Sequence, residues 1–168
     1  MGLPDAPWHR HLGVYAVTRD DPRGLFVVHK TRGPYKGLYD LPGGSLHDGE
    51  SMAQALLREV REETGYDCSV TGDLGLHEFL VRTEHAGTDY THHIAIFRAV
   101  ELQGRVGLVD REVTDREGME LNDSSGPSFL RLDEDPDVAA CSPLVRRCFA
   151  ILRGGTYPSD LELIDRAT

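Results

Sequence analysis

The sequence predicts a mixed α/β domain in which helices cover a β-sheet. Extended apolar stretches stand before and after one strongly patterned helix, and a second helical pattern follows near the end of the chain. No internal repeat or linker divides the 168 residues, a length that can bury a substantial core. We therefore expect a single domain over residues 1–168.

The composition narrows the class of protein. A formal net charge of −10 and a pI near 5.2 argue against a surface that coats nucleic acid. The apolar runs are too short to span a bilayer, and the first ten residues lack the apolar core of a signal peptide. The three cysteines form no C-x-x-C pair, which favours reduced, buried thiols. We expect a soluble cytoplasmic protein without a membrane partner. A metal and a few cations could still attract a small anion locally.

Two strands and a loop are predicted before the central helix. The segment Asp21-Pro22-Arg23-Gly24 has the residue order of a type I turn, so we expect its flanking strands to form a hairpin. The predicted pieces are a loose lead-in over 1–10, strands over 12–18 and 25–30, a glycine-rich loop over 31–38, and a short extended piece over 39–41 before Pro42.

The central helix is the most clearly indicated element. Ser51 as N-cap places Gln54 at the third helical position, which is the spacing of a capping box. Gly65 is placed to end the helix in a left-handed conformation. The residues whose spacing predicts a core-facing stripe are Ala53, Leu56, Leu57, Val60 and Thr64.

The second half of the chain predicts an antiparallel strand pair and a closing helix. The expected order is a strand over 68–81, a turn over 82–89, a strand over 90–100, a long surface loop over 101–128 with a short strand near 107–113, and one more strand over 129–132. Ser142 as N-cap and Pro143 at the first helical position begin the last helix, which Gly154-Gly155 ends.

Three glutamates on the central helix are the main candidates for chemistry. Glu59 and Glu63 are one turn apart and Glu62 is three residues from Glu59, so the carboxylates converge on a face about 120° from the apolar stripe. Like charges repel, but Mg²⁺ reverses the balance because it prefers carboxylate and phosphate oxygens. The alternative is an exposed helix face with Arg58 and Arg61 as salt-bridge partners.

The segment Leu41-Pro42-Gly43-Gly44 favours the metal interpretation, because a simple salt-bridged helix face does not account for it. Gly43 and Gly44 allow a sharp turn and a close approach of the backbone to a ligand or metal. Lys30, Arg32 and Lys36 lie in or beside the preceding loop. We weigh contact with a phosphate evenly against solvated surface charge for these three cations.

The segment from Gly44 to Tyr66 resembles the Nudix box, G-x5-E-x7-R-E-U-x-E-E-x-G-U, in which U is apolar. Eight positions match outright, namely Gly44, Glu50, Arg58, Glu59, Val60, Glu62, Glu63 and Gly65. Tyr66 stands in the last U position, and the preceding LPGG is also usual in that family. By this pattern the chain is similar to the Nudix hydrolases, MutT-like nucleotide pyrophosphohydrolases.

The resemblance implies an α/β/α sandwich with a mixed β-sheet between helices. It also implies a pyrophosphohydrolase that uses Mg²⁺ or Mn²⁺ and acts on a nucleoside diphosphate linked to a group X. Arg58 would orient Glu59, and Glu50 would brace the loop or bind the metal through water. The implied metal ligands are Glu59, Glu62 and Glu63, with the backbone of Gly43 and Gly44 nearby.

The proton acceptor and the substrate stay open. An acid often precedes an aromatic residue near the end of simple family members, but Ser128-Phe129 stands there, so Glu120 and Asp123 are considered as substitutes. We favour Glu59 or Glu63 as the general base. The residues that mark ADP-ribose or diadenosine-polyphosphate members are absent at the expected distances after the box. This absence favours a nucleoside triphosphate or related small nucleotide.

Several alternatives accompany this prediction. ADP-ribose or a nucleotide sugar could be the substrate, the domain could sense a nucleotide without cleaving it, or it could bind another protein. A second copy of the chain is considered as a partner.

We interpret the following aromatic and histidine side chains as core or surface residues rather than as ligand contacts. Four aromatics that could stack on a base are interpreted as core, namely Tyr15, Tyr35, Tyr39 and Phe79. His92 and His93 should point to opposite faces of a strand, and His47 should face solvent.

Overall fold

The computed structural model describes residues 5–84, 88–105, 124–155 and 163–167. Its elements are β1 (Trp8–Val17), β2 (Leu25–Lys30), β3 (Tyr39–Asp40), β4 (Gly43–Ser45), α1 (Met52–Thr64), β5 (Tyr66–Glu84), β6 (Thr88–Arg105), β7 (Ser124–Leu130), the 3₁₀ turn η1 (Val138–Ala140), α2 (Pro143–Leu152) and β8 (Leu163–Ala167).

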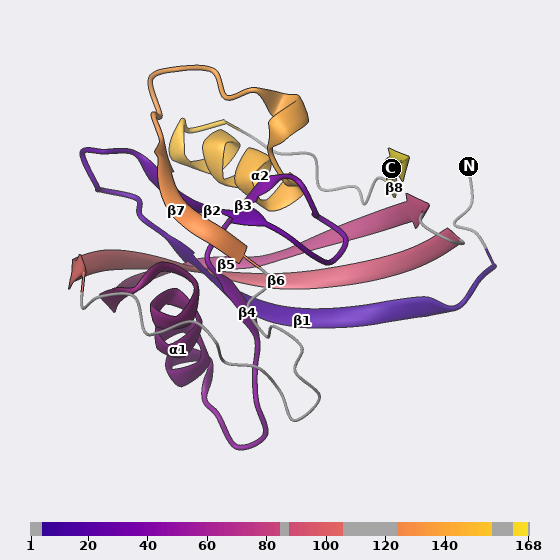
Figure 1. Ribbon diagram of the computed structural model, residues 1–168, viewed down its shortest axis with the longest axis horizontal. Helices are drawn as coiled ribbons and strands as arrows, with labels where there is room; N and C mark the ends of the chain where they lie inside the picture. Colours follow the sequence, from indigo (N-terminus) through magenta and orange to yellow (C-terminus); the bar gives the residue numbers. More distant parts are fainter. Residues whose placement is uncertain (1–4, 85–87, 106–123, 156–162, 168) are drawn as a thin grey trace.

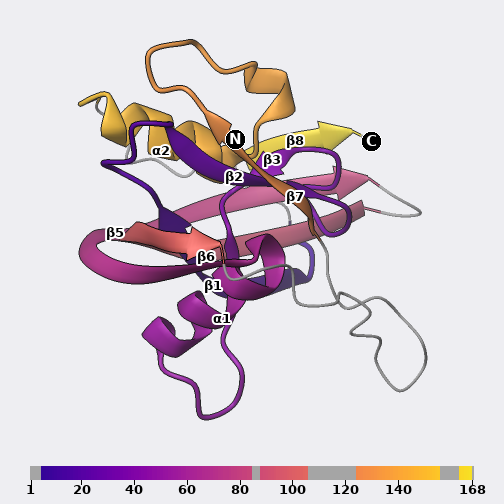
Figure 2. The ribbon, with the colours of Figure 1, turned by 60° about the vertical axis from the view of Figure 1, so that its left-hand side comes forward.

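Two sheets form the frame of the molecule. The larger has the strand order β4-β1-β6-β5-β8, and the smaller has the order β3-β2-β7. The larger sheet is mixed, because β1 pairs parallel with β6 while β5 pairs antiparallel with β6. In Figure 1 the small sheet and α2 lie on one side of the long strands, and α1 lies on the other. The turned view in Figure 2 shows the same arrangement.

Successive side chains of β1 point to opposite faces of the large sheet, so β1 contributes to both core layers. Tyr15 and Val17 belong to the cluster that includes residues of α2, whereas Val14 and Ala16 belong to the cluster that includes residues of α1. A strand buried on both faces in this way is a central strand of its sheet. The predicted α/β sandwich with a mixed sheet is therefore confirmed.

The predicted hairpin between the first two strands is wrong, because β1 and β2 belong to different sheets. The turn at 21–24 forms as expected, with Gly24 N–H donating to the Asp21 carbonyl at 3.0 Å. The Thr18 hydroxyl donates to the Gly24 carbonyl at 3.0 Å and accepts from Phe26 N–H at 2.8 Å. These bonds replace strand pairing where the chain leaves the large sheet.

Strand ends also differ from the prediction. β1 starts at Trp8, inside the expected lead-in, where Trp8 packs against Tyr90 of β6 with ring centroids 5.1 Å apart. β5 extends to Glu84 and β6 starts at Thr88, which leaves a shorter connection than the turn expected over 82–89. Parallel pairing with β6 accounts for the early start of β1, because such a partner is invisible to local sequence patterns.

The expected loop over 101–128 is too long at both ends. β6 continues to Arg105, and β7 occupies Ser124–Leu130 rather than 129–132. The β7 strand pairs antiparallel with β2, which explains why it extends beyond its short apolar segment. The predicted strand near 107–113, Glu120 and Asp123 lie outside the described residues. β8, which pairs parallel with β5, was not predicted.

The capping prediction for α1 is confirmed. Ser51 accepts from Gln54 N–H, the Gln54 side chain accepts from Ser51 N–H, and Gly65 is left-handed with φ 72°. The predicted core stripe is wrong at two positions, because Ala53 is exposed and Leu57 is 41% exposed. Leu57 stands about 100° around the helix from the buried Leu56. The helix instead buries Ala55 and Glu63 alongside the expected Leu56, Val60 and Thr64.

The closing helix begins and ends as predicted. Ser142 caps α2 by accepting from Val145 N–H at 3.2 Å, and its hydroxyl donates to the buried Asp40 carboxylate at 2.6 Å. The three cysteines are free and buried. None of the helices in the described part of the chain combines the length and apolar character needed to cross a bilayer.

Candidate active site

Arg58 connects the loop before α1 with the carboxylates on the helix. Its Nε and Nη2 donate to the two oxygens of Glu50 at 2.7 and 2.9 Å. Its Nη1 donates to Glu59 Oε1 at 2.8 Å and to Glu62 Oε2 at 3.3 Å. Its Nη2 also donates to the Ser45 carbonyl at 3.0 Å. One guanidinium therefore fixes the loop and two of the three candidate carboxylates.

Glu50 is the carboxylate that holds this arrangement from the loop side. It accepts from Arg58 and from His47 N–H, the latter at 2.9 Å. The Arg58 hydrogen bond and the His47 amide lower the pKa of Glu50 to about 2, and Glu50 in turn raises the pKa of Arg58. Glu50 thus acts as a brace for the loop in this structure, one of the two roles that the box resemblance implied.

Gly44 lies directly against the carboxylate of Glu59. A Cβ atom built on Gly44 would stand 2.8 Å from Glu59 Oε1 and 3.0 Å from its carboxyl carbon. Any side chain at position 44 would therefore displace Glu59 or fill the space beside it. The glycine keeps that space open between the backbone of β4 and the helix.

Glu63 occupies a different environment from its two neighbours. Its side chain is only 4% exposed, its Oε2 accepts from Gly43 N–H at 2.9 Å, and its Oε1 pairs with Lys30 Nζ at 3.3 Å. Burial of a carboxylate is costly unless it is paired and hydrogen-bonded, and both conditions are met here. The three carboxylates predicted to converge on one face of the helix therefore have different environments, because Glu63 points inward.

The backbone conformation at position 43 requires a glycine. Its φ of 146° is unusual for residues with a side chain, and a Cβ would meet the Val14 carbonyl oxygen at 2.1 Å. Gly43 pairs with Tyr15 across the β1–β4 ladder. This close approach to β1 places its N–H where Glu63 accepts it.

A hydrogen-bonded chain of buried tyrosine and histidine side chains lies against β4, and the sequence did not predict it. The Tyr15 hydroxyl bonds His93 Nε2 at 2.8 Å, and the Tyr35 hydroxyl bonds His93 Nδ1 at 2.8 Å. His11 Nε2 lies 3.1 Å from the Tyr15 hydroxyl. Burial, with the nearby charges of His11, Lys30 and His92, lowers the pKa of His93 to about 3.

A sequence signal for this chain existed. His93 alternates with Ala95 and Phe97 on the inward face of β6, so a period-two pattern places His93 in the core. Burial raises the pKa of Tyr15 well above its usual range, with the nearby Asp40, Tyr35, Glu63 and Glu59 adding to the effect. Tyr15 and Tyr35, predicted simply as core, are buried as expected, and both also use their hydroxyls as hydrogen-bonding groups.

The remaining predicted residues divide between the site and the surface. Lys30 is at the site through its pair with Glu63. Arg32 and Lys36 are exposed on the loop over 31–38, which we call the basic loop. His92 faces outward and pairs with Glu78 at 2.9 Å, so the two adjacent histidines do point apart. His47 is exposed as expected. Ser128 and Phe129 pair with β2.

The carboxylates of Glu59 and Glu62 are of the chemical kind that binds a hard divalent cation, but their arrangement suits such a cation less well. Within the described ranges, no three or more histidine, cysteine or acidic side chains gather closely enough to hold a metal. Glu59 and Glu62 nevertheless direct carboxylate oxygens to the same Arg58 nitrogen, and Gly44 leaves space beside Glu59. Carboxylate and backbone oxygens are the ligands that Mg²⁺ prefers, so these residues fit such a group.

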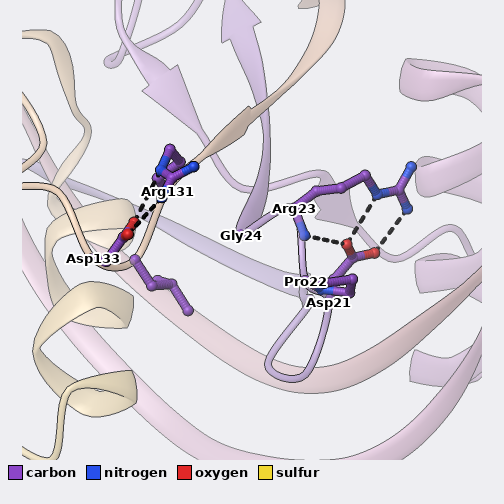
Figure 3. A pocket seen from close by; sticks show the side chains of 7 residues that line it. Asp21, Pro22, Arg23, Gly24, Arg131 and Asp133 are labelled. Carbon is purple, nitrogen blue, oxygen red and sulfur yellow. Dashed lines mark hydrogen bonds and ion pairs between the residues drawn. The ribbon is translucent and has the colours of Figure 1, made fainter.

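A pocket of about 240 Å³ lies away from these carboxylates. Its lining comes from the turn at 21–24 and from residues 131–133 after β7. Figure 3 shows Arg23 bonded to Asp21 and Arg131 bonded to Asp133, so each cation is neutralised by a near neighbour. No residue of the Gly44–Tyr66 box lines it, and we assign the chemistry to the carboxylates instead.

Comparison with known proteins decides the family. The model of the NUDIX domain matches residues 9–139. The chain belongs to the Nudix family. A MutT protein from Methanosarcina mazei Go1 has a similar fold, with a TM-score of 0.61, 22% identity, and coverage of 89% of this chain and 97% of that chain. A MutT Nudix hydrolase from Burkholderia pseudomallei also has a TM-score of 0.61, with 19% identity and coverage of 84% and 96%.

Two curated Nudix relatives match a shorter stretch. A putative 8-oxo-dGTP diphosphatase from Bacillus subtilis (strain 168) is 32% identical over 66 residues, which cover 39% of this chain and 42% of that protein. An ADP-ribose pyrophosphatase from Methanocaldococcus jannaschii is 35% identical over 69 residues, which cover 41% of this chain and 40% of that protein. The chain thus spans about two-fifths of the length of these relatives.

Proposed function

We propose that this Nudix protein is a divalent-metal-dependent pyrophosphohydrolase. Its substrate class is a nucleoside diphosphate linked to a group X, with a nucleoside triphosphate or related small nucleotide favoured. The observation that carries the proposal is the intact box in its folded form, in which Arg58 bonds both Glu59 and Glu62 and the Glu59 carboxylate lies beside Gly44. A module that only senses a nucleotide has no need of a complete set of oriented carboxylates.

The chain's own residues have separable roles in this reaction. Glu59 and Glu62 would hold the cation, with the backbone of Gly43 and Gly44 beside them. A bound divalent cation would neutralise phosphate charge and lower the pKa of a bound water. Glu59 is the better candidate for proton acceptor, because Glu63 is buried and accepts from both Lys30 and Gly43. Lys30 and the exposed Arg32 and Lys36 would contact the phosphates.

Relatives support the reaction class and leave the substrate open. One relative is named a putative 8-oxo-dGTP diphosphatase and another an ADP-ribose pyrophosphatase. These compounds share a phosphoanhydride but differ in the group beyond it. ADP-ribose therefore stays beside the nucleoside triphosphates as an alternative substrate.

A substrate panel tests this proposal. Purified protein is incubated with nucleoside triphosphates, 8-oxo-dGTP, ADP-ribose and a nucleotide sugar, each with Mg²⁺, with Mn²⁺ or with EDTA, and the products are identified by chromatography. We expect a nucleoside monophosphate and the remaining phosphate compound from at least one substrate, in the metal samples alone. Binding without cleavage across the panel would instead support a nucleotide sensor.

A further inference from the structure

The basic loop over 31–38 adjoins the carboxylate end of the site. It starts directly after Lys30 and leads through β3 to Gly43. Lys30 Nζ and Gly43 N–H both contact the Glu63 carboxylate. The segment from Lys30 to Gly43, which contains the basic loop and β3, is thus held at both ends by one carboxylate, and the exposed Arg32 and Lys36 lie within it.

One residue of the basic loop is buried. Tyr35 is 2% exposed, whereas Arg32 and Lys36 on either side are exposed. Its ring stacks on the His93 imidazole with an interplanar angle of 23°, and its hydroxyl bonds His93 Nδ1 at 2.8 Å. Tyr35 therefore fastens an otherwise exposed loop to β6 of the large sheet.

His93 is itself held rigidly from the other side. Its Nε2 bonds the Tyr15 hydroxyl, and Tyr15 packs so closely on β4 that a Cβ on Gly43 would stand 2.9 Å from its ring. The Tyr15 hydroxyl also lies over Gly13, where a Cβ would meet it at 2.7 Å. A neutral imidazole has one donor and one acceptor nitrogen, so one tyrosine hydroxyl accepts from His93 and the other donates to it.

We propose that His93 is a positioning residue of this site. Through Tyr35 it fastens the basic loop to the same sheet that supports Gly43, and so sets how well Arg32 and Lys36 are placed for an anionic phosphate chain. This inference rests on the proposed function for its catalytic consequence. The fastening of the loop itself does not depend on which reaction occurs.

The physical consequence of loosening the loop falls on substrate binding. Four backbone bonds shape the loop. They run from Lys36 N–H to the Gly33 carbonyl, from Gly37 N–H to the Lys30 carbonyl, from Leu38 N–H to the Tyr35 carbonyl, and from Lys30 N–H to the Leu38 carbonyl. A loop without its anchor must be ordered when substrate binds, and that ordering lowers affinity. Arg58 and Glu59 both lie on α1 and not on the basic loop, so the chemical step should change less.

Four variants test the inference. Tyr35→Phe removes one hydroxyl and keeps the ring, His93→Phe removes both bonds of the imidazole, and His93→Gln restores one donor and one acceptor. His92→Gln is the matched control, because His92 is the adjacent residue on the outward face and pairs with Glu78. Each variant is measured for KM and kcat on the best panel substrate and for amide hydrogen exchange without substrate.

Tyr35→Phe and His93→Phe should raise KM by about three- to tenfold, the range expected for one net hydrogen bond, with kcat nearly unchanged. Exchange of the Lys36, Gly37 and Leu38 amides should accelerate by a similar factor while α1 amides keep their rates. His93→Gln should recover part of both losses, and His92→Gln should match the wild type.

Hydrogen exchange and the kinetic constants test separate parts of the proposal. Unchanged loop exchange in His93→Phe would overturn the anchoring role whatever the kinetics show. Faster loop exchange with an unchanged KM would overturn the link to substrate. A fall in kcat alone, with His93→Gln no better than His93→Phe, would point to a general packing defect and overturn the proposal. If the wild-type chain hydrolyses nothing, the proposed function fails, and the exchange data still decide whether His93 anchors the loop.

Discussion

Each carboxylate of the box has its own environment. Glu59 and Glu62 share one nitrogen of Arg58, whereas Glu63 is buried against Lys30 and Gly43. The resemblance to the Nudix box implied that Arg58 orients Glu59, and residue spacing predicted the cluster of carboxylates. It could not predict the inward position of Glu63, because that depends on a lysine 33 residues earlier in the chain.

Replacing Glu59 by glutamine tests the assignment of the proton acceptor. The variant keeps the size of the side chain and removes its charge, so kcat should fall by about 10² or more. The measurement is steady-state hydrolysis of the best panel substrate with Mg²⁺. Glu101→Gln is a matched control on the exposed face of β6 and should keep full activity. Retention of full activity by Glu59→Gln would show that another group accepts the proton.

Gly44→Ala tests the space beside Glu59. The new Cβ would lie 2.8 Å from Glu59 Oε1, so the carboxylate must move. We expect weaker Mn²⁺ binding in a calorimetric titration and a loss of kcat, with little change in the melting temperature. Gly72→Ala serves as the control, because its Cβ would make an ordinary contact of 3.6 Å with Ala99. Equal Mn²⁺ affinity in Gly44→Ala and wild type would contradict this account of Gly44.

At the scale of elements, the helix caps and the antiparallel pair of β5 with β6 are confirmed, whereas pairings between more distant segments were not predicted. The caps of α1 and α2 follow from Ser51, Gly65 and Ser142, whose effects lie within one helical turn. The parallel pairing of β1 with β6 joins segments about eighty residues apart, and no residue in β1 encodes that partner locally. The same reason explains the false hairpin and the missed β8.

Ser51→Ala tests how much the cap contributes to the helix that carries the site. The variant loses the bond from Gln54 N–H to the serine hydroxyl, so the free energy of unfolding should fall by about 1 kcal/mol. Urea denaturation followed by circular dichroism measures this loss. Ser51→Gly should cost only a few tenths of a kcal/mol relative to wild type. A loss below that of the glycine variant would contradict the capping role.

At the scale of the whole molecule, two core layers hold the site between them. The box helix packs on one face of the large sheet, and the Tyr15–His93–Tyr35 chain lies in the core of the other. β4 stands at the edge of that sheet, where Gly43 reaches Glu63.

The stability of the molecule should depend on acid through His93. Burial lowers the pKa of His93 from 6.5 to about 3 in the folded state. Below pH 6.5 the unfolded chain therefore binds a proton at His93 that the folded chain does not bind. Stability from this group is complete above pH 6.5 and is lost as pH falls toward 3. The slope should approach about 1.4 kcal/mol per pH unit.

Urea denaturation of metal-free protein between pH 7 and pH 4 measures this slope. His93→Gln removes the titrating group, so its free energy of unfolding should fall less steeply with acid than that of wild type. His92→Gln should retain the wild-type slope. Parallel curves for His93→Gln and wild type would show that burial does not hold His93 neutral.

The central claim is that the folded box cleaves a phosphoanhydride with water. Its most direct test follows the best panel nucleotide in H₂¹⁸O with Mg²⁺ by ³¹P NMR. The account predicts that the nucleotide disappears, that one ¹⁸O enters a single phosphate product, and that EDTA stops the reaction. Recovery of bound but intact nucleotide without ¹⁸O, for every substrate in the panel, would contradict the account.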